Sequence, residues 1–473
     1  MSKLKSNFIY NAAYQILVLI IPFITTPYIA RTIGATGVGI YSYTYSIVSY
    51  FMMFALLGMN NYGNREVAKN KDNKEKINYT FSSIYYLQLI VTIITLGIYI
   101  LYIIIFDNEY FKIEMIQVIY LISVAFDINW LFCGLQKFKI TVTRSAIIKI
   151  LTLGLILIFV KNENDLWKYT LILATTTLFN QIILWPFLKK EVRFVKVKFK
   201  DIINHLKPTL ILFIPILAIS VYRVMDKIMI GNMANVTEVG YYENAEKMLN
   251  IIMSIVAALG TVTLPQMTYL YNNNKIEEYN RILNKSIKLI FFMVLPIIAG
   301  FIVTGDSLVL IYLGEEFKKS SILLKILSIS LLFSPIAGII RMQFFIPRNK
   351  DKEYIISVVL GAITNFILNY ILIVKYQAIG ATIATVISEL VVAYTQYIFI
   401  RKEINFKDYI IDIIDFAIKS GIMLVVVYFI GNIIENEIIK LIVQIIVGIL
   451  LYGVFNLKYI TSQIDISKFL RRN

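Results

Sequence analysis

The chain has 473 residues, of which 58% are hydrophobic and only 16% are charged, with a formal net charge of +16. A soluble domain has about 45–50% apolar and about 25% charged residues, so this composition excludes an ordinary soluble protein. One cysteine and one histidine exclude a disulfide framework, a cysteine-based metal cluster and a multi-histidine proton relay.

Apolar runs long enough to cross a bilayer as helices, about 20 residues each, recur along the whole chain. Hydropathy predicts about fourteen spans. Their expected limits are 8–30, 38–60, 78–106, 113–135, 143–160, 166–188, 208–231, 239–266, 282–304, 321–346, 354–374, 379–400, 411–431 and 438–458. Strand alternation is absent, so the predicted fold class is an all-α polytopic membrane protein.

The connections between these spans alternate in charge. Even-numbered connections such as 64–76 and 189–201 are rich in Lys and Arg, whereas 231–238 and 431–437 contain neither. Both chain termini are basic as well, so the positive-inside rule places both termini in the cytoplasm and favours an even number of spans. The charge is thus explained by topology, and no nucleic-acid partner is expected.

Similar sequences follow the first and the seventh span, which predicts an internal repeat. Val38 to Tyr41 corresponds to Val239 to Tyr241, and ALLG at 55–58 corresponds to AALG at 257–260. Six spans return the chain to its starting side, so the copies would be parallel repeats around a central cavity. The expected domains are an N-terminal six-helix lobe at 1–190, a basic cytoplasmic linker at 191–207, a second six-helix lobe at 208–402, and two appended helices with a basic tail at 403–473.

Charged residues inside the spans are the candidate site, because a charge at the centre of a bilayer costs roughly 3 kcal/mol. Arg223, Asp226 and Lys227 lie within about one helical turn, and two cations around one carboxylate leave a surplus positive charge. In the alternative interpretation, Arg223 snorkels to the outer surface and the group is a structural pair. Arg31 has the corresponding place in the first copy, across the cavity from Arg223, or is an ordinary interfacial arginine.

Three further residues complete the predicted site. Arg341 would meet the substrate in the inward-open state or anchor its span at the membrane surface. Asp127 and Glu389 would carry a coupling ion or act as counter-ions, and Asp127 could instead cap or hydrogen-bond a neighbouring helix. No catalytic residue, metal site or cofactor is expected. Because the chain has no G-x-x-x-x-G-K-[ST] stretch, ATP is not expected to drive transport directly.

The stretch 126–150 follows a family pattern of an acidic residue, a tryptophan, a glycine and a basic, aromatic turn. These places are filled by Asp127, Trp130, Gly134, Phe138 and Arg144. Three other stretches read like the same family, namely 39–51, 63–76 and 225–231. Over essentially its whole length the chain resembles the Wzx-type polysaccharide flippases of the MOP exporter superfamily, which also holds the MATE drug exporters and the lipid II flippase MurJ.

The resemblance implies a flippase that moves undecaprenyl-diphosphate-linked oligosaccharide repeat units from the cytoplasmic to the outer leaflet, by alternating access, for O-antigen or capsule biosynthesis. It implies the bacterial cytoplasmic (inner) membrane as location, and membrane lipids, a polysaccharide polymerase and chain-length machinery as partners. Three alternatives stay open: a MurJ-like lipid II or teichoic-type exporter, a MATE-like drug or cation antiporter, and a membrane polymerase or glycosyltransferase. An enzyme is not expected, because the longest outer loop, 305–321, lacks a catalytic cluster.

Overall fold

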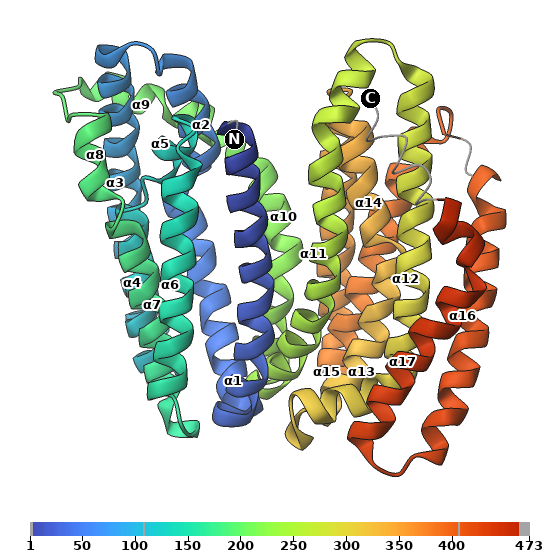
Figure 1. Cartoon of the computed structure of the whole chain (residues 1–473). Helices are drawn as coiled ribbons and strands as arrows, with labels where there is room; N and C mark the ends of the chain where they lie inside the picture. Colours follow the sequence, from blue (N-terminus) through green and yellow to red (C-terminus); the bar gives the residue numbers. More distant parts are fainter. Residues whose placement is uncertain (1–2, 107–108, 405–406, 463–473) are drawn as a thin grey trace. The chain divides into compact units, whose positions relative to one another are not determined.

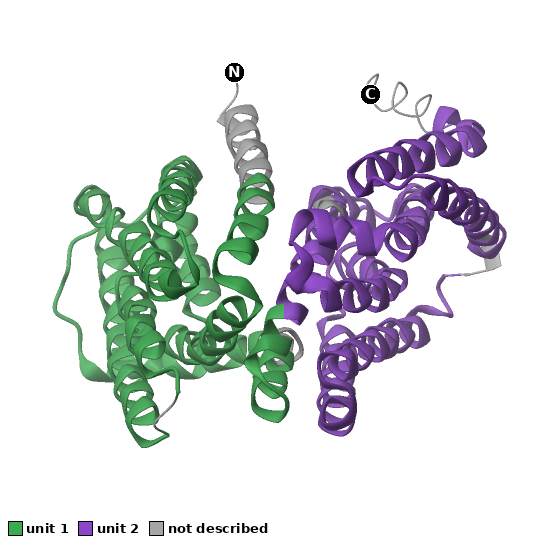
Figure 2. Ribbon diagram, turned by 90° about the horizontal axis from the view of Figure 1, so that it is seen from below, with its two compact units in different colours: residues 1–240 green, residues 241–473 purple. Residues whose placement is uncertain are grey.

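The computed structural model describes residues 3–106, 109–404 and 407–462, without the side chains of 3–19, 215, 218–219, 221–223, 255, 258 and 407–408. In these ranges every regular element is a helix (Figure 1). The chain forms two compact units, residues 1–240 and 241–473 (Figure 2), which are described one by one below. The lobe boundaries expected from the repeat stay a prediction.

Unit 1 is built from ten α-helices and the first residues of an eleventh. They are α1 (Lys3–Leu56), α2 (Met59–Asn70), α3 (Lys74–Ile105), α4 (Phe111–Ala125), α5 (Asn129–Gly134), α6 (Phe138–Phe159), α7 (Leu166–Ile182), α8 (Trp185–Glu191), α9 (Phe199–Asn204), α10 (Leu206–Met233) and the start of α11 (Val236–Asn272), with a 3₁₀ turn at Glu163–Asp165. The helices α2, α5 and α9 gather at one end of this unit, called the basic end here because the lysine-rich loops lie there (Figure 1).

Unit 2 contains the rest of α11 and the helices that follow it. They are α12 (Ile276–Tyr312), α13 (Lys318–Ser328), α14 (Ser334–Ile340), α15 (Asp351–Ile400), α16 (Lys407–Ile433) and α17 (Glu437–Phe455), with 3₁₀ turns at Glu315–Phe317 and Ile329–Leu332 and a π-helical turn at Arg341–Phe345. The two helices expected as an appendage, α16 and α17, pack against α12 and belong to this unit.

Eleven helical segments of the described chain are long and apolar enough to cross a membrane. Two of them contain a non-helical residue and therefore hold two spans each: α1 breaks at Gly34 (φ 68°) and α15 at Gln377 (φ 52°). Dividing these two gives thirteen segments, and α10, a helix of 28 residues outside this set, would make fourteen. The prediction of an all-α multi-pass membrane protein is confirmed, and the predicted count of about fourteen spans is compatible with these helices.

Three of the expected spans are interrupted, which the sequence did not indicate. The span 113–135 is divided into α4 and α5, and 166–188 into α7 and α8. The span 321–346 changes from α13 through a 3₁₀ turn and α14 to a π-helical turn. Inside a bilayer such breaks are tolerated only where protein groups satisfy the freed backbone atoms. The partners at these breaks therefore indicate which side chains matter for the fold.

Candidate functional site

The structure distributes the predicted site residues over both units. Arg31 lies on α1, three residues before the break at Gly34, and Asp226 and Lys227 lie in the last third of α10. Asp127 lies between α4 and α5, also in unit 1. The predicted residues of unit 2, Arg341 and Glu389, are placed on the π-helical turn and on α15. A shared cavity for the two sets stays a prediction.

In unit 1 the cluster on α10 is anchored by a buried carboxylate. Asp226 is 2% exposed and Lys227 is half-buried, whereas Arg31 is exposed. The Arg223 side chain lies outside the described residues, so its predicted place in this charged cluster remains untested. A carboxylate buried in a membrane helix is tolerated when charged or polar groups compensate it locally. Asp226 therefore fits the counter-ion role better than that of a freely solvated acid.

Two tyrosines of α1 contact α10 on either side of this cluster. The Tyr50 hydroxyl donates to the Ser220 carbonyl at 3.2 Å, and the Tyr43 hydroxyl donates to Asn232 Oδ1 at 2.6 Å. Tyr50 also lies within electrostatic range of Asp226. Sequence analysis did not single out these tyrosines. Their spacing of seven residues places both side chains on one face of a helix, and this spacing could have identified them from the sequence.

The repeated Val-Gly motifs meet where the second half of α1 crosses the start of α11. A Cβ atom on Gly39 would lie 1.7 Å from the Val236 carbonyl oxygen, and one on Gly240 would lie 2.0 Å from the Ala35 carbonyl oxygen. The hydroxyls of Thr36 and Thr237 are 2.9 Å apart beside them. Only glycine permits two backbones to approach this closely. We call residues 35–39 and 236–240 the glycine crossing.

A group of tyrosines fills the interior of unit 1 near this crossing. The hydroxyls of Tyr41 and Tyr120 are 2.9 Å apart, the rings of Tyr41 and Tyr45 are stacked at 5.5 Å, and Tyr169 meets Tyr41 edge-on at 5.0 Å. Glu114, on the first turn of α4, is 1% exposed in the same region. Sequence analysis missed this acid, although it lies inside the predicted span 113–135. The N-terminus of a helix stabilises such a carboxylate.

Asp127 caps the break between α4 and α5. Its Oδ1 accepts a hydrogen bond from the Asn129 backbone N–H at 2.9 Å. Gln88 on α3 completes the break, since its Nε2 donates to the carbonyls of Val124 at 2.7 Å and of Asp127 at 2.9 Å. The indole N–H of Trp130 donates back to Gln88 Oε1 at 3.0 Å. The structure thus gives Asp127 a capping contact, and its role in ion coupling stays a prediction.

Replacing Gln88 by leucine should destabilise unit 1. The change removes the side-chain partner of the Asp127 carbonyl oxygen and of the Trp130 indole N–H, whereas the Val124 carbonyl keeps its bond from the Asp127 N–H. Each buried group left without a partner costs about 1–3 kcal/mol. We expect a fall of the thermal midpoint of the purified protein, measured by intrinsic fluorescence. Gln266→Leu is the matched control, because Gln266 is exposed on α11. An equal fall in both variants would contradict the role of Gln88.

In unit 2 one predicted residue lies on an irregular turn and the other, on the regular helix α15, contacts the residue that starts α14. Arg341 begins the π-helical turn, and its guanidinium carbon lies 4.7 Å from the centre of the Tyr354 ring. The Ser334 hydroxyl, at the start of α14, donates to Glu389 Oε1 at 3.0 Å. Turns with 3₁₀ or π geometry inside a helix often mark hinges or functional sites. These contacts are compatible with either interpretation that the sequence left open for Arg341.

The chain is similar to known proteins in both sequence and fold. The family model described as "Polysaccharide biosynthesis protein" matches residues 4–270, more than half of the chain. The chain belongs to the polysaccharide biosynthesis protein family. It is 23% identical over 403 residues to a "Putative O-antigen transporter" of Escherichia coli K12, covering 84% of the chain and 97% of that protein. It is 24% identical over 405 residues to the "Capsular polysaccharide biosynthesis protein CapF" of Staphylococcus aureus, covering 84% and 99%.

Solved structures show the fold of this family member. A structure of "Lipid II flippase MurJ, inward closed conformation" superimposes with a TM-score of 0.78 at 18% identity, covering 97% of this chain and 99% of that one. An inward-facing MATE transporter of the MOP superfamily gives a TM-score of 0.57 at 15% identity, covering 81% and 97%. The family model thus confirms the predicted resemblance to polysaccharide flippases at the level of the family, and these structures confirm the predicted fold.

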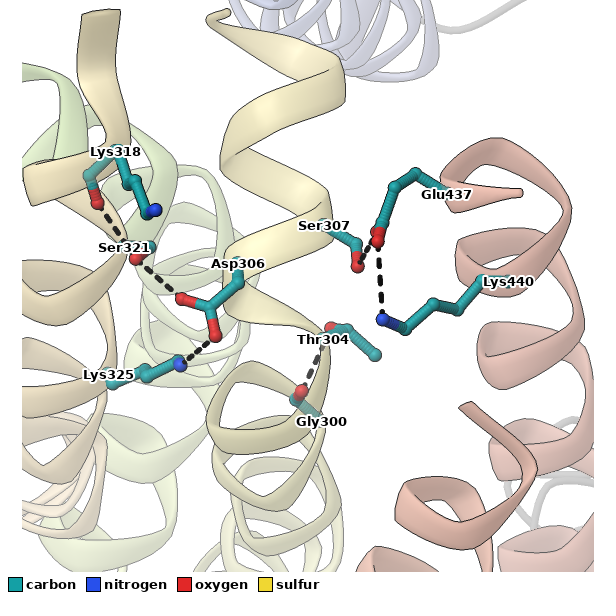
Figure 3. A network of polar contacts seen from close by, with 9 residues as sticks. All are labelled: Gly300, Thr304, Asp306, Ser307, Lys318, Ser321, Lys325, Glu437 and Lys440. Carbon is teal, nitrogen blue, oxygen red and sulfur yellow. Dashed lines mark hydrogen bonds and ion pairs between the residues drawn. The ribbon is translucent and has the colours of Figure 1, made fainter. Parts of the chain in front are cut away.

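Side-chain contacts hold the last two helices, α16 and α17, against α12 near both of its ends. Figure 3 shows one end, where Ser307 on α12 donates to Glu437 on α17 at 2.5 Å. The adjacent residue, Asp306, pairs with Lys325 of α13 at 2.5 Å. Toward the other end of α12, Lys288 pairs with Asp412 on α16. Among the described residues no group of three or more His, Cys, Asp or Glu could hold a metal ion.

Proposed function

We propose that this chain is a flippase that moves undecaprenyl-diphosphate-linked oligosaccharide repeat units from the cytoplasmic to the outer leaflet for surface polysaccharide biosynthesis. The observation that carries this is a buried carboxylate beside a lysine inside membrane helix α10, in a chain of the polysaccharide biosynthesis family. The chain is a transporter and not an enzyme. We place it in the bacterial inner membrane with both termini in the cytoplasm, where a polymerase and chain-length machinery would consume its product.

The chemistry of the substrate supports the roles that we assign. A diphosphate cannot cross hydrocarbon unaided, and arginine binds phosphate well because its planar fork donates two parallel hydrogen bonds. In the proposal Arg31, Arg223 and Lys227 bind the diphosphate, and Asp226 balances them when the site is empty. The hydroxyls of Tyr43 and Tyr50, on the helix that faces α10, would contact the first sugars.

The residues of unit 2 and the break of α4 and α5 have secondary roles in this proposal. Arg341 would meet the diphosphate in the inward-open state. Glu389 and Asp127 would act as counter-ions or carry a coupling ion. The glycine crossing would close the path on the side opposite to the basic end, and it would separate when the substrate leaves. Alternating access of this kind needs one contact that forms in one state and breaks in the other.

The test is the sidedness of the lipid-linked oligosaccharide in cells that lack this protein, read with a membrane-impermeant sugar-modifying reagent. In these cells the repeat unit should accumulate on the cytoplasmic leaflet. Expression of the wild-type protein should restore its transfer to the outer leaflet. Arg31→Ala and Arg223→Ala should each slow flipping by about 10- to 100-fold, because a hydrogen bond to a charged group contributes about 1.5–3 kcal/mol. The control variant Arg401→Ala changes an exposed arginine in a loop and should restore flipping to the wild-type rate.

Two results would contradict parts of the proposal. Full rescue by both arginine variants at normal expression would contradict the role of the two arginines in binding the diphosphate. The proposal that the chain is a flippase would not be affected. Normal outward display of the repeat unit in the deletion strain, with altered polymer length, would instead indicate a polymerase.

A further inference from the structure

A basic segment at the basic end of unit 1 is held in place by side chains of α3. This segment, residues 189–203, is called the strap here; it joins α8 to α10 and is extended between α8 and α9. The Arg193 backbone N–H donates to Asn78 Oδ1 at 2.9 Å, and the Val195 backbone N–H donates to Ser82 Oγ at 3.0 Å. Two polar side chains of a membrane helix therefore fix the strap backbone in one register.

Aromatic packing holds the same part of the strap. The Phe194 ring lies 5.3 Å from the Phe81 ring and 5.6 Å from the Tyr85 ring, centre to centre, and it stacks on Trp185 at 6.3 Å. Val192 beside it is 3% exposed. Because alternate side chains of an extended segment point in opposite directions, Arg193, between Val192 and Phe194, is turned outward and is exposed.

The far end of the strap is tied down as well. The Tyr79 hydroxyl donates to Asp201 at 2.5 Å. Just after the strap, the two ring nitrogens of His205 bond to the hydroxyls of Tyr62 at 2.7 Å and of Ser83 at 2.8 Å. Burial lowers the pKa of His205, so this bridge is formed by the neutral ring near neutral pH. The strap is a fixed part of the surface at both ends.

The cations of the strap are left without partners by this arrangement. Its six basic side chains are all exposed, and none pairs with another residue in the described part of the chain. They are Lys189, Lys190, Arg193, Lys196, Lys198 and Lys200. The two acids of the strap are engaged elsewhere, Glu191 with Lys137 and Asp201 with Tyr79. The strap thus presents a surplus of positive charge on a fixed backbone.

Large apolar side chains are exposed between these cations. Phe199 is 67% exposed and Ile203 is 40% exposed, and their spacing of four residues places them on one face of α9. Ile202, on the neighbouring side of this helix, is 7% exposed and packs in the core with Met59 and Phe213. A short helix that exposes apolar side chains and is flanked by lysines is typical of a segment at a membrane surface.

We propose that the strap binds the headgroups of anionic phospholipids in the leaflet at the basic end, with Phe199 and Ile203 at the boundary of the acyl chains. The lysines match the charge of phosphate groups, and the exposed apolar residues distinguish this surface from one made for an acidic protein or a nucleic acid. The inference goes beyond the transported substrate and does not depend on it. Since the strap leads directly into α10, bound lipid would also fix the start of the helix that carries Asp226.

The test uses the purified full-length chain in a neutral detergent, titrated with fluorescent phosphatidylglycerol and, separately, with phosphatidylcholine. Wild type should prefer phosphatidylglycerol. The variant K196Q/K198Q/K200Q should bind it roughly a hundredfold more weakly, from about 1 kcal/mol per lysine near an anionic surface. The matched control K71Q/K352Q/K402Q removes three exposed lysines outside the strap and should bind as wild type does.

Three results would overturn the inference. Unchanged binding of phosphatidylglycerol by the strap variant would show that the strap is not the lipid-binding site. An equal loss of binding in the control variant would show that only the overall positive charge of the protein matters. Binding of polyglutamate in place of phosphatidylglycerol would assign the strap to an acidic protein. A second variant, Phe199→Ser, should weaken the binding of both lipids without changing the preference. Because the readout is lipid binding, failure here would leave the flippase proposal intact.

Discussion

Gly240→Ala is expected to prevent α11 from reaching its place against α1 and to abolish transport. The added methyl group would lie 2.0 Å from the Ala35 carbonyl oxygen, and the same change at Gly39 would place one 1.7 Å from the Val236 carbonyl oxygen. Both obstacles are backbone atoms that cannot rotate away, so we expect a cost of about 3 kcal/mol or more, at the upper end for overpacking. The measurements are the thermal midpoint and the rate of flipping.

Gly97→Ala supplies the matched control for this prediction. Gly97 lies on α3, a membrane helix of the same unit, and a Cβ atom there would meet nothing within 4 Å. The control should therefore keep the wild-type midpoint and rate. If Gly240→Ala and Gly39→Ala also keep both, the close approach at the glycine crossing is not needed by the working protein.

A disulfide across the glycine crossing is expected to stop transport completely and reversibly. The hydroxyls of Thr36 and Thr237 are 2.9 Å apart, which places the two side chains at a separation that a disulfide can span. In the variant T36C/T237C/C133A, which also removes the one native cysteine, oxidation should lock the crossing. Flipping should fall in proportion to the cross-linked fraction and return on reduction.

The single-cysteine variants T36C and T237C, each with C133A, are the controls for oxidation itself and should keep transport under the same conditions. Full transport by a fully cross-linked protein would show that the crossing stays closed throughout the cycle. The substrate would then have to leave by another path, and the role proposed for the crossing would be wrong.

The fold could be predicted well from the sequence, because the strongest pattern in the sequence, its hydropathy, reflects the preference of apolar helices for the bilayer over water. Apolar length decides whether a helix spans, and lysine-rich loops decide its direction, so hydropathy and charge predicted about fourteen spans. The breaks were beyond this signal, since they depend on partners distant in sequence. The break between α4 and α5 exists because Gln88, on another helix, supplies the bonds that its backbone lost.

The candidate site was predicted less completely than the fold. Intramembrane charge singled out Asp226 and Lys227, and the structure places them on a helix that packs against α1. The repeat identified Gly39 and Gly240 as equivalent, but no pattern in one chain could show that these glycines touch. Glu114 needed no structure, because an acid inside a predicted span is visible in the sequence.

The contacts that hold α16 and α17 against α12 can form only late in the synthesis of the protein. The Ser307 partner, Glu437, follows it by 130 residues, and the Asn284 partner, Tyr409, follows by 125. During synthesis α12 therefore enters the bilayer long before the groups that satisfy its polar side chains exist. Until α16 and α17 are inserted, the translocon or lipid headgroups must supply polar contacts to these side chains. A ribosome that stalls before residue 409 would release a chain whose α12 is poorly suited to lipid, and quality-control proteases can recognise such a helix.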